Sequence, residues 1–300
     1  MKIIITGSLG NISKPLAIEL VQKGHQVTVI SSRPERQKEI ENIGAKAAIG
    51  TVQDVDFLTA TFEGADIVYL MGMFEAAGSV FDKDVDFIGA FLKIGNNYKQ
   101  SIQQAGVKRI IYLSAIGAHL NKGNGVLFIH YNVEHLLKEL PDDVSIKIMR
   151  AAAFYTNTFR FIETIKKQGV IVSNYGGDKK EPWVSPLDIA SAISEEVDQP
   201  FDRRAVRYVA SEEVSPNEIA KVLGEAIGKP GLKWVVLPDQ QLLDGMLSIG
   251  INPQIANGLV EMQAIQRSGL LYEDYYSNQP TLGKIKLTGF VKDFVTAYNQ

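Results

Sequence analysis

The first residues arranged in a way that suits chemistry form a glycine turn at residues 6–13, which reads Thr-Gly-Ser-Leu-Gly-Asn-Ile-Ser. The turn follows an apolar strand segment and precedes a stretch with helical periodicity. Gly7 suits a tight turn, and Gly10 lets a pyrophosphate approach free backbone N–H groups at a helix start. The pattern therefore predicts a dinucleotide site, with a purely structural turn as the alternative. The predicted contacts here are Thr6, Gly7, Leu9, Gly10, Asn11 and Ile12.

The end of the second predicted strand carries hydroxyl and guanidinium groups where an acid would bind the two ribose hydroxyls of NAD. Ser32 and Arg33 follow this strand directly, and these groups suit a phosphate on the ribose 2′ position. The segment therefore predicts NADP as the cofactor, with NADPH preferred over NADH. The alternative is that Arg33 and Arg36 are solvated residues at the start of a helix.

Other chemistries find little support in the residue types. The chain has no cysteine, which excludes a disulfide, a thiolate metal site and a cysteine nucleophile. His130 and His135 are five residues apart, so they do not share a helix face as a metal-binding pair would, and we expect no metal site. A hydrolytic triad of Ser114, His130 and an Asp is disfavoured because Ser114 lacks the G-x-S-x-G context.

Composition describes a globular chain without a charged binding surface. Of its 300 residues 45% are hydrophobic and 22% charged, which excludes a disordered chain. The formal net charge of −3 and the absence of like-charge blocks argue against direct contact with nucleic acid or an anionic membrane. No apolar run approaches the roughly 20 residues of a membrane span, and no signal-peptide core is present, so we expect a cytoplasmic protein.

The elements that position these groups alternate between strand-length apolar runs and helical stretches through the first half. This alternation is typical of βαβ units, and it predicts an α/β fold with a Rossmann-type, doubly wound parallel sheet. Glycines 24, 44, 64 and 106 each stand where a helix should end before the next strand. The predicted strands are Lys2 to Thr6, Gln26 to Ile30, Ala45 to Ile49, Asp66 to Leu70, Arg109 to Leu113 and Val144 to Met149.

The regularity weakens after Met149. The later pattern predicts helices at 154–168, 185–197 and 215–228 and strands at 170–173 and 232–237, with a mostly helical segment from Asp239 onward. We therefore expect residues 1–150 to form an NAD(P)-binding domain. Residues 151–300 are expected to complete the sheet and to form a smaller, mostly helical substrate lobe.

Ligands of such sheets bind beyond the carboxyl ends of the strands, which places further candidates near the nicotinamide. Met71, Met73 and Phe74 are expected to form an apolar, adaptable wall there, although packing on the lobe is an equal alternative. The predicted cofactor contacts at these strand ends are Met71, Gly72, Met73, Ser114, Ala153 and Phe154.

Several motifs together resemble the NmrA-like family of atypical short-chain dehydrogenase/reductases. They are the glycine turn, Arg33, residues 62–69 (Phe-Glu-Gly-Ala-Asp-Ile-Val-Tyr), residues 112–118 (Tyr-Leu-Ser-Ala-Ile-Gly-Ala) and residues 185–190 (Ser-Pro-Leu-Asp-Ile-Ala). Within that family the segments 130–134 and 149–157 resemble the NADPH-dependent quinone and triphenylmethane reductase branch. The resemblance spans nearly the whole chain and thins toward the C-terminus.

This resemblance implies roles for residues that spacing alone does not assign. It places His130 on the nicotinamide side, as a proton donor or an orienting group, with a histidine on the helix surface as the alternative. It places Tyr155 opposite His130 as a second catalytic residue. Phe74, Tyr131, Tyr155 and Asn157 are the implied substrate contacts, with packing as the alternative for the tyrosines.

The chain departs from the family pattern at two places. Val126 and His130 stand where short-chain enzymes usually have Tyr and Lys, so the usual proton donor is missing. Thr51 stands where an Asp commonly helps to hold adenine, and Thr51, backbone groups and Asp54 are the available substitutes.

These observations predict an NADPH-dependent reductase that passes hydride to a small, planar, apolar acceptor such as a quinone. Reduction of a quinone depends less on a proton donor than reduction of a carbonyl to an alcohol. The alternative is a non-catalytic sensor that binds NAD(P) and acts through a protein partner. The sequence predicts a monomer or a homodimer, with no nucleic-acid or membrane partner.

Overall fold

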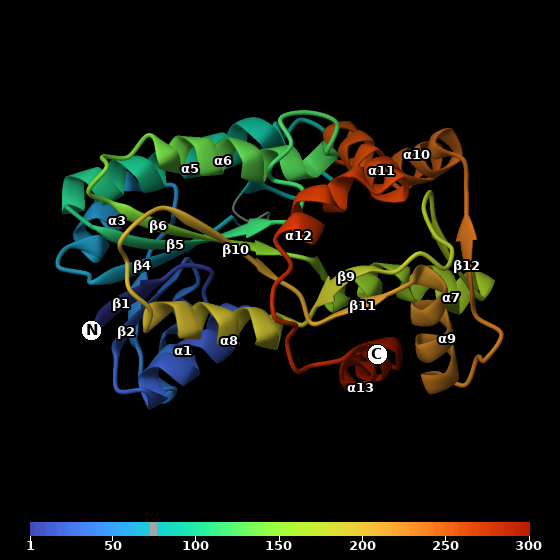
Figure 1. Cartoon of the computed structure of the whole chain (residues 1–300), viewed down its shortest axis with the longest axis horizontal. Helices are drawn as coiled ribbons and strands as arrows, with labels where there is room; N and C mark the ends of the chain where they lie inside the picture. The colour runs from blue at the N-terminus through green and yellow to red at the C-terminus, as the bar shows by residue number, and fades with distance from the viewer. Residues whose placement is uncertain (73–76) are drawn as a thin grey trace.

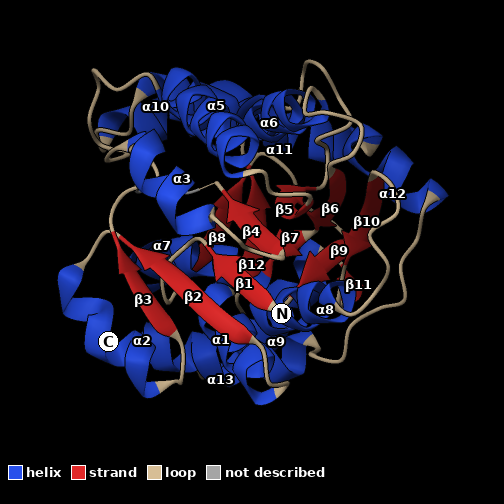
Figure 2. Cartoon of the chain, turned by 90° about the vertical axis from the view of Figure 1, so that its left-hand side faces the viewer, coloured by secondary structure: helices blue, strands red, loops and turns tan. Residues whose placement is uncertain are grey.

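A parallel sheet forms the centre of the computed structural model, which describes residues 1–72 and 77–300. Its seven strands run in the order β10-β6-β5-β4-β1-β2-β3, and every neighbouring pair is parallel (Figures 1 and 2). The order reverses between β1 and β4, so the predicted Rossmann-type, doubly wound sheet is confirmed. The strands are β1 (Lys2–Ile5), β2 (Gln26–Ser31), β3 (Lys46–Ile49), β4 (Ile67–Met71), β5 (Arg109–Ala115), β6 (Ser145–Ala151) and β10 (Ala205–Val209).

Helices cover both faces of this sheet, which explains why its inner strands are continuous apolar runs. Side chains alternate across β1, so that Ile3 and Ile5 face one core and Ile4 faces the other. Helices α3, α5 and α6 lie on one side of the sheet and α1 and α8 on the other (Figure 1). The helices around the sheet are α1 (Ser13–Gln22), η1 (Pro34–Arg36), α2 (Gln37–Asn42), α3 (Val55–Phe62), α5 (Phe87–Ala105), η2 (Gly125–Leu127), α6 (Phe128–Lys138) and α8 (Pro186–Val197).

Most of the remaining elements build a second body of structure at the other end of the molecule, whereas residues 270–277 pack into the core of the large sheet beside β10 (Figure 1). Two small sheets, β11-β9-β7 and β12-β8, lie among its helices. The elements are β7 (Ala153–Phe154), η3 (Tyr155–Phe161), α7 (Ile162–Gln168), β8 (Val170–Ser173), β9 (Glu181–Val184), β11 (Glu212–Val214), α9 (Pro216–Ala226), β12 (Lys233–Val236), α10 (Asp239–Ser248), α11 (Pro253–Ser268), η4 (Leu270–Tyr272), α12 (Glu273–Ser277) and α13 (Leu287–Tyr298).

The six strands predicted in the first half are confirmed, and the helix-ending glycines 24, 44, 64 and 106 all have positive φ. Strand β10 was not predicted. It is an edge strand that pairs only with β6, and it leaves Val206 and Arg207 partly or fully exposed. Because β10 is short and lies at the edge of the sheet, its sequence lacks the continuous apolar run that marks a strand buried on both faces. This explains why the strand was not predicted.

None of the helices described in residues 1–72 and 77–300 has the length and apolar character needed to cross a membrane.

Candidate functional site

The glycine turn, the end of β2 and the end of β3 line one cavity of about 430 Å³, which we call the glycine-turn cavity. It lies at the carboxyl ends of neighbouring parallel strands, where doubly wound sheets bind ligands. Six predicted contacts are thereby brought together, namely Gly7, Leu9, Gly10, Ser32, Arg33 and Thr51. Ser31 and Arg36, which supply the second hydroxyl and the second guanidinium group after β2, line it as well. Sequence reasoning did not assign a role to Ser8, Val52 or Gln53, which also line it.

The turn owes its shape to two residues in the left-handed region. Gly7 has φ +89°, and a side chain there would collide with Met71 and Ser13. Ser8 has φ +55°, an uncommon value for a residue with a side chain. Its Oγ donates to Ser31 Oγ at 2.9 Å, and its N–H donates to the Ile30 carbonyl at 3.0 Å. These bonds hold the turn against the end of β2 and so fix the cavity between them.

Thr6 and Ser13 support the turn from below. Both are buried, and Ser13 Oγ donates to the Thr6 carbonyl at 2.9 Å. The backbone N–H of Met71 donates to Thr6 Oγ1 at 3.0 Å, which ties the end of β4 to the end of β1. Ser13 stands where dinucleotide folds often have a third glycine. Its hydrogen bond to the Thr6 carbonyl shows how a small hydroxyl side chain allows the same close packing of helix on strand.

The corner of the cavity beyond β2 is cationic and hydroxylic. Ser32 and Arg33 are exposed and line the cavity together with Arg36. Arg36 Nη1 also donates to Glu39 at 3.1 Å, and Lys14 pairs with the same carboxylate at 2.9 Å. None of the described residues that line the cavity is acidic.

At the β3 side of the cavity Thr51 is exposed, and Asp54 is engaged elsewhere. The Asp54 carboxylate accepts the Phe57 N–H at 3.0 Å and so caps α3. The Asn97 amide donates to the carbonyls of Val52 and Gln53, both at 3.1 Å, and fixes the backbone of this wall. Thr51 Oγ1 accepts the Gln53 N–H at 3.3 Å and lines the cavity, whereas the Asp54 carboxylate serves the helix.

His130 lies on the first turn of α6 and packs against β5. Its Nδ1 and the Tyr112 hydroxyl are 3.1 Å apart and share a hydrogen bond. Burial lowers the pKa of His130 to about 4, with Glu134 opposing that shift. Burial likewise raises the pKa of Tyr112 well above its usual range. The imidazole is therefore neutral at pH 7, which suits a hydrogen-bonding group better than an acid.

Ser114, at the end of β5, belongs to a buried charge network beside His130. Its Oγ donates to Glu134 Oε1 at 2.6 Å, and Arg150 binds the same carboxylate through Nε at 3.0 Å and Nη2 at 2.8 Å. Arg150 Nη1 reaches Asp274 of α12 at 2.9 Å and so links α6 to the C-terminal elements. Ser114 and His130 thus have different partners, an arrangement that does not form a hydrolytic triad.

A second cavity, of about 170 Å³, lies beyond the ends of β5 and β6, and we call it the Trp183 cavity. Its walls include Ala153, Phe154 and Asn157, three predicted contacts that the structure brings together. Most of its lining is apolar. The other lining residues are Ala115, Ile116, Leu127, Ala151, Ala152, Arg160, Tyr175, Trp183, Met262, Gln266, Leu271 and Tyr272.

Tyr155 lies elsewhere than expected. Its ring is fully buried, stacked between Trp183 (6.4 Å between centroids) and Phe290 (5.4 Å), and its hydroxyl donates to Glu212 Oε1 at 2.6 Å. Instead of facing His130, it packs in the core of the C-terminal elements, because aromatic partners far along the chain enclose it. Its catalytic role stays a sequence-based prediction.

Tyr131 faces a third cavity, near His119, His135 and Lys138, and its ring centroid lies 4.0 Å from that of His135. The structure thus separates it from Phe154 and Asn157.

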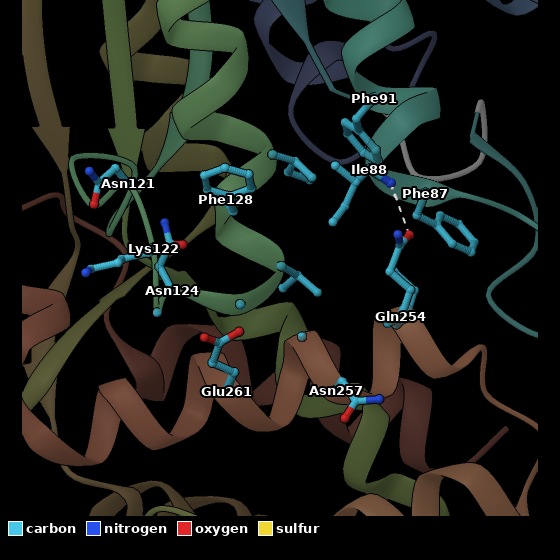
Figure 3. A pocket seen from close by; sticks show the side chains of 16 residues that line it. Phe87, Ile88, Phe91, Asn121, Lys122, Asn124, Phe128, Gln254, Asn257 and Glu261 are labelled. Carbon is cyan, nitrogen blue, oxygen red and sulfur yellow. Dashed lines mark hydrogen bonds between the residues drawn. The ribbon is translucent and has the colours of Figure 1, made fainter.

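A fourth cavity, of about 390 Å³, lies between α5, the segment before α6 and α11, and we call it the α5–α11 cavity (Figure 3). Phe87, Ile88, Phe91 and Phe128 give it an apolar wall. Gln254 on α11 accepts the Ile88 N–H at 3.1 Å and joins the two sides (Figure 3).

One side of this cavity depends on two glycines. A side chain at Gly125, where φ is +57°, would collide with the Gly258 carbonyl, and a Cβ at Gly258 would lie 2.8 Å from Val126 Cγ1. Backbone therefore meets backbone where α11 crosses the start of η2.

The remaining candidates are placed as follows. Asn11 is exposed, Ile12 is buried, and Gly72 packs so closely on Phe91 that a side chain would collide with its ring. Met73 and Phe74 lie outside the described residues. No group of three or more His, Cys, Asp or Glu side chains in residues 1–72 and 77–300 is placed to hold a metal ion.

A doubly wound parallel sheet with a glycine-turn cavity at the carboxyl ends of β1, β2 and β3 defines a Rossmann-type α/β protein. The model of the NmrA-like family matches residues 1–278, and the chain belongs to that family. An L-arabinose 1-dehydrogenase (NAD(P)(+)) from Haloferax volcanii is 23% identical in an alignment of length 258 that covers 82% of this chain and 88% of the relative.

Solved structures share the fold at low identity. An NADPH-dependent quinone oxidoreductase from Escherichia coli, complexed with NADPH, is 19% identical with a TM-score of 0.77, over 97% of this chain and 99% of that one. A triphenylmethane reductase from Citrobacter sp. is 17% identical with a TM-score of 0.71, over 99% of this chain and 100% of that one.

Proposed function

We propose that this chain is an NADPH-dependent reductase that transfers hydride to a small, planar, apolar acceptor such as a quinone. The observation that carries the proposal is the glycine-turn cavity, whose corner beyond β2 combines Ser32 and Arg33 with no acidic lining residue among those described. The NADPH complex of the similar quinone oxidoreductase and the similar dye reductase support it.

The residues present fit the cofactor in each part of the site. The backbone of Gly7 to Gly10 would hold the pyrophosphate, since Gly10 leaves that side of the turn open. Ser32 and Arg33 would hold the 2′-phosphate, and Thr51 with its backbone neighbours would lie along the adenine. Ala153 and Phe154 would contact the nicotinamide half, which supplies hydride when bound.

The Trp183 cavity suits an apolar acceptor, because most of its lining consists of apolar side chains such as its alanines and Phe154. A few polar groups in the lining could orient the acceptor. The direct test is NADPH oxidation with a panel of quinones, triphenylmethane dyes and carbonyl compounds. A protein that binds NADPH with high affinity and reduces none of them contradicts the proposal and favours a sensor.

Arg33→Glu is expected to weaken NADPH binding about ten- to a hundredfold, because one charge-assisted contact is lost and a like charge faces the phosphate. NADH binding should change little, so the preference for NADPH shrinks or reverses. Isothermal titration calorimetry of both cofactors measures the effect, with the exposed Arg203→Glu as the matched control. Equal affinities of the unmodified protein for NADPH and NADH would rule out the 2′-phosphate contact.

His130→Ala is expected to lower kcat with an active quinone by about tenfold or more and to leave NADPH affinity nearly unchanged. Since burial holds the pKa of His130 at about 4, its titration should be absent from the pH profile at neutral pH. Stopped-flow kinetics with His135→Ala, an exposed histidine on the same helix, as control give the comparison. A native kcat in His130→Ala would remove His130 from the site.

A further inference from the structure

The Trp183 cavity has a polar side that the apolar acceptor site does not explain. Glu181 on β9 is only 5% exposed, and it accepts hydrogen bonds from Gln266 Nε2 at 2.9 Å and from the Tyr272 hydroxyl at 2.8 Å. Both donors line the cavity. The carboxyl group is therefore connected to the cavity through two side chains that come from α11 and η4.

Among residues 1–72 and 77–300, no Lys, Arg or His forms an ion pair with this carboxyl group, although Lys179 lies near enough to lower its pKa. A buried carboxyl without a cationic partner costs free energy in its charged form. It is thus suited to bind and release a proton.

The groups around Glu181 determine the pKa of its carboxyl group. Tyr175, Trp183 and Gln266 face it, and Tyr276 lies near it on α12. Burial, opposed by the bonds from Gln266 and Tyr272, raises the pKa of Glu181 to about 7. Burial and the nearby Glu181 keep the pKa of Tyr272 well above its usual range, so Tyr272 always carries its proton.

The indole of Trp183 also faces Glu181. Its Nε1 is buried and lies close enough to Glu181 to lower the pKa of that carboxyl group. Trp183 itself is 1% exposed and lines the cavity. Glu181 is thus separated from the cavity by side chains that can bind to it.

We propose that Glu181 is the proton source for the bound acceptor, with Tyr272 passing the proton into the Trp183 cavity. The inference rests on the reductase function proposed above. It supplies a donor for a chain that has Val126 and His130 in the place of the usual Tyr and Lys.

When the nicotinamide supplies hydride, the acceptor would become an anion and the cofactor would be oxidised. With Glu181 protonated, its carboxyl group donates to the Tyr272 oxygen, which reverses the hydrogen bond of the ionised form. The phenolic proton of Tyr272 would then move to the acceptor oxygen while the Glu181 proton moves to the Tyr272 oxygen. Glu181 ends as a carboxylate and is reprotonated from solvent after the product leaves.

The test compares Glu181→Gln and Tyr272→Phe with Glu213→Gln and Tyr275→Phe. Tyr275 and Glu213 form the same kind of hydrogen bond, 3.2 Å long, but neither lines the cavity, so they are matched controls. NADPH oxidation with 1,4-naphthoquinone is followed from about pH 5 to about pH 9. Calorimetry measures NADPH affinity, and infrared spectra of the cofactor-free protein follow the carboxyl C=O band.

In Glu181→Gln and Tyr272→Phe, kcat is expected to fall about ten- to a hundredfold. The change of kcat with pH near neutrality should be lost, and NADPH affinity should be unchanged. The infrared band that titrates near neutral pH should disappear in Glu181→Gln, and both control variants should behave as the unmodified protein. A native kcat and pH profile in Glu181→Gln overturns this inference and leaves the reductase function standing. NADPH binding without reduction of any acceptor by the unmodified protein overturns the reductase function, and this inference with it.

Discussion

Gly10→Val is expected to abolish dinucleotide binding and to leave the sheet intact. A Cβ at Gly10 would meet only the Gly7 carbonyl, at 3.3 Å, and Gly10 has no positive φ, so the backbone tolerates the substitution. The new side chain would stand in the glycine-turn cavity, where the pyrophosphate needs the backbone N–H groups. Calorimetry with NADPH measures the loss, and circular dichroism checks the fold.

The control is Gly231→Val, at a glycine that also lacks a positive φ and has open space around its Cβ position. Gly7 is unsuitable for this test, because a side chain there would distort the turn itself. Native affinity for NADPH in Gly10→Val would place the phosphate site elsewhere.

Glu134→Ala is expected to destabilise the protein by about 3–5 kcal/mol, because it leaves the buried Arg150 without its principal partner. Glu134 has no exposed surface and accepts three hydrogen bonds, two from Arg150 and one from Ser114. Asp274 remains, but it reaches only one nitrogen of the guanidinium. Urea unfolding monitored by circular dichroism gives the change in the free energy of unfolding.

The exposed pair of Glu163 and Lys167, 3.2 Å apart on α7, provides the comparison. Glu163→Ala should cost less than about 1 kcal/mol, because solvent screens that pair. A similarly small change in Glu134→Ala would mean that the network around Arg150 contributes little to stability.

The sheet and the phosphate side of the site were accessible from the sequence, because both follow from local patterns combined with one topological rule. Apolar runs marked the strands, and residues next to their carboxyl ends had to meet at one edge. Gly10, Arg33 and Thr51 therefore line one cavity although they come from three βα units.

The opposite side of the site depends on long-range packing, which local patterns do not record. Tyr155 follows β6, as expected from the resemblance of segment 149–157. Its ring does not face His130, because Trp183 and Phe290 enclose it. Glu181 lies between the predicted strand at 170–173 and the predicted helix at 185–197, where no element was assigned. Only its burial against Gln266 and Tyr272, about ninety residues later, makes it a titratable group of interest. A buried carboxylate of this kind has no sequence signal of its own.

The close approach of Gly125 and Gly258 makes one wall of the α5–α11 cavity sensitive to substitution. A Cβ at Gly125 would collide with the Gly258 carbonyl, and a Cβ at Gly258 would lie 2.8 Å from Val126 Cγ1. All three residues line the cavity. A side chain at either glycine must therefore displace this wall, so the cavity tolerates variation in its other lining residues better than at these two positions.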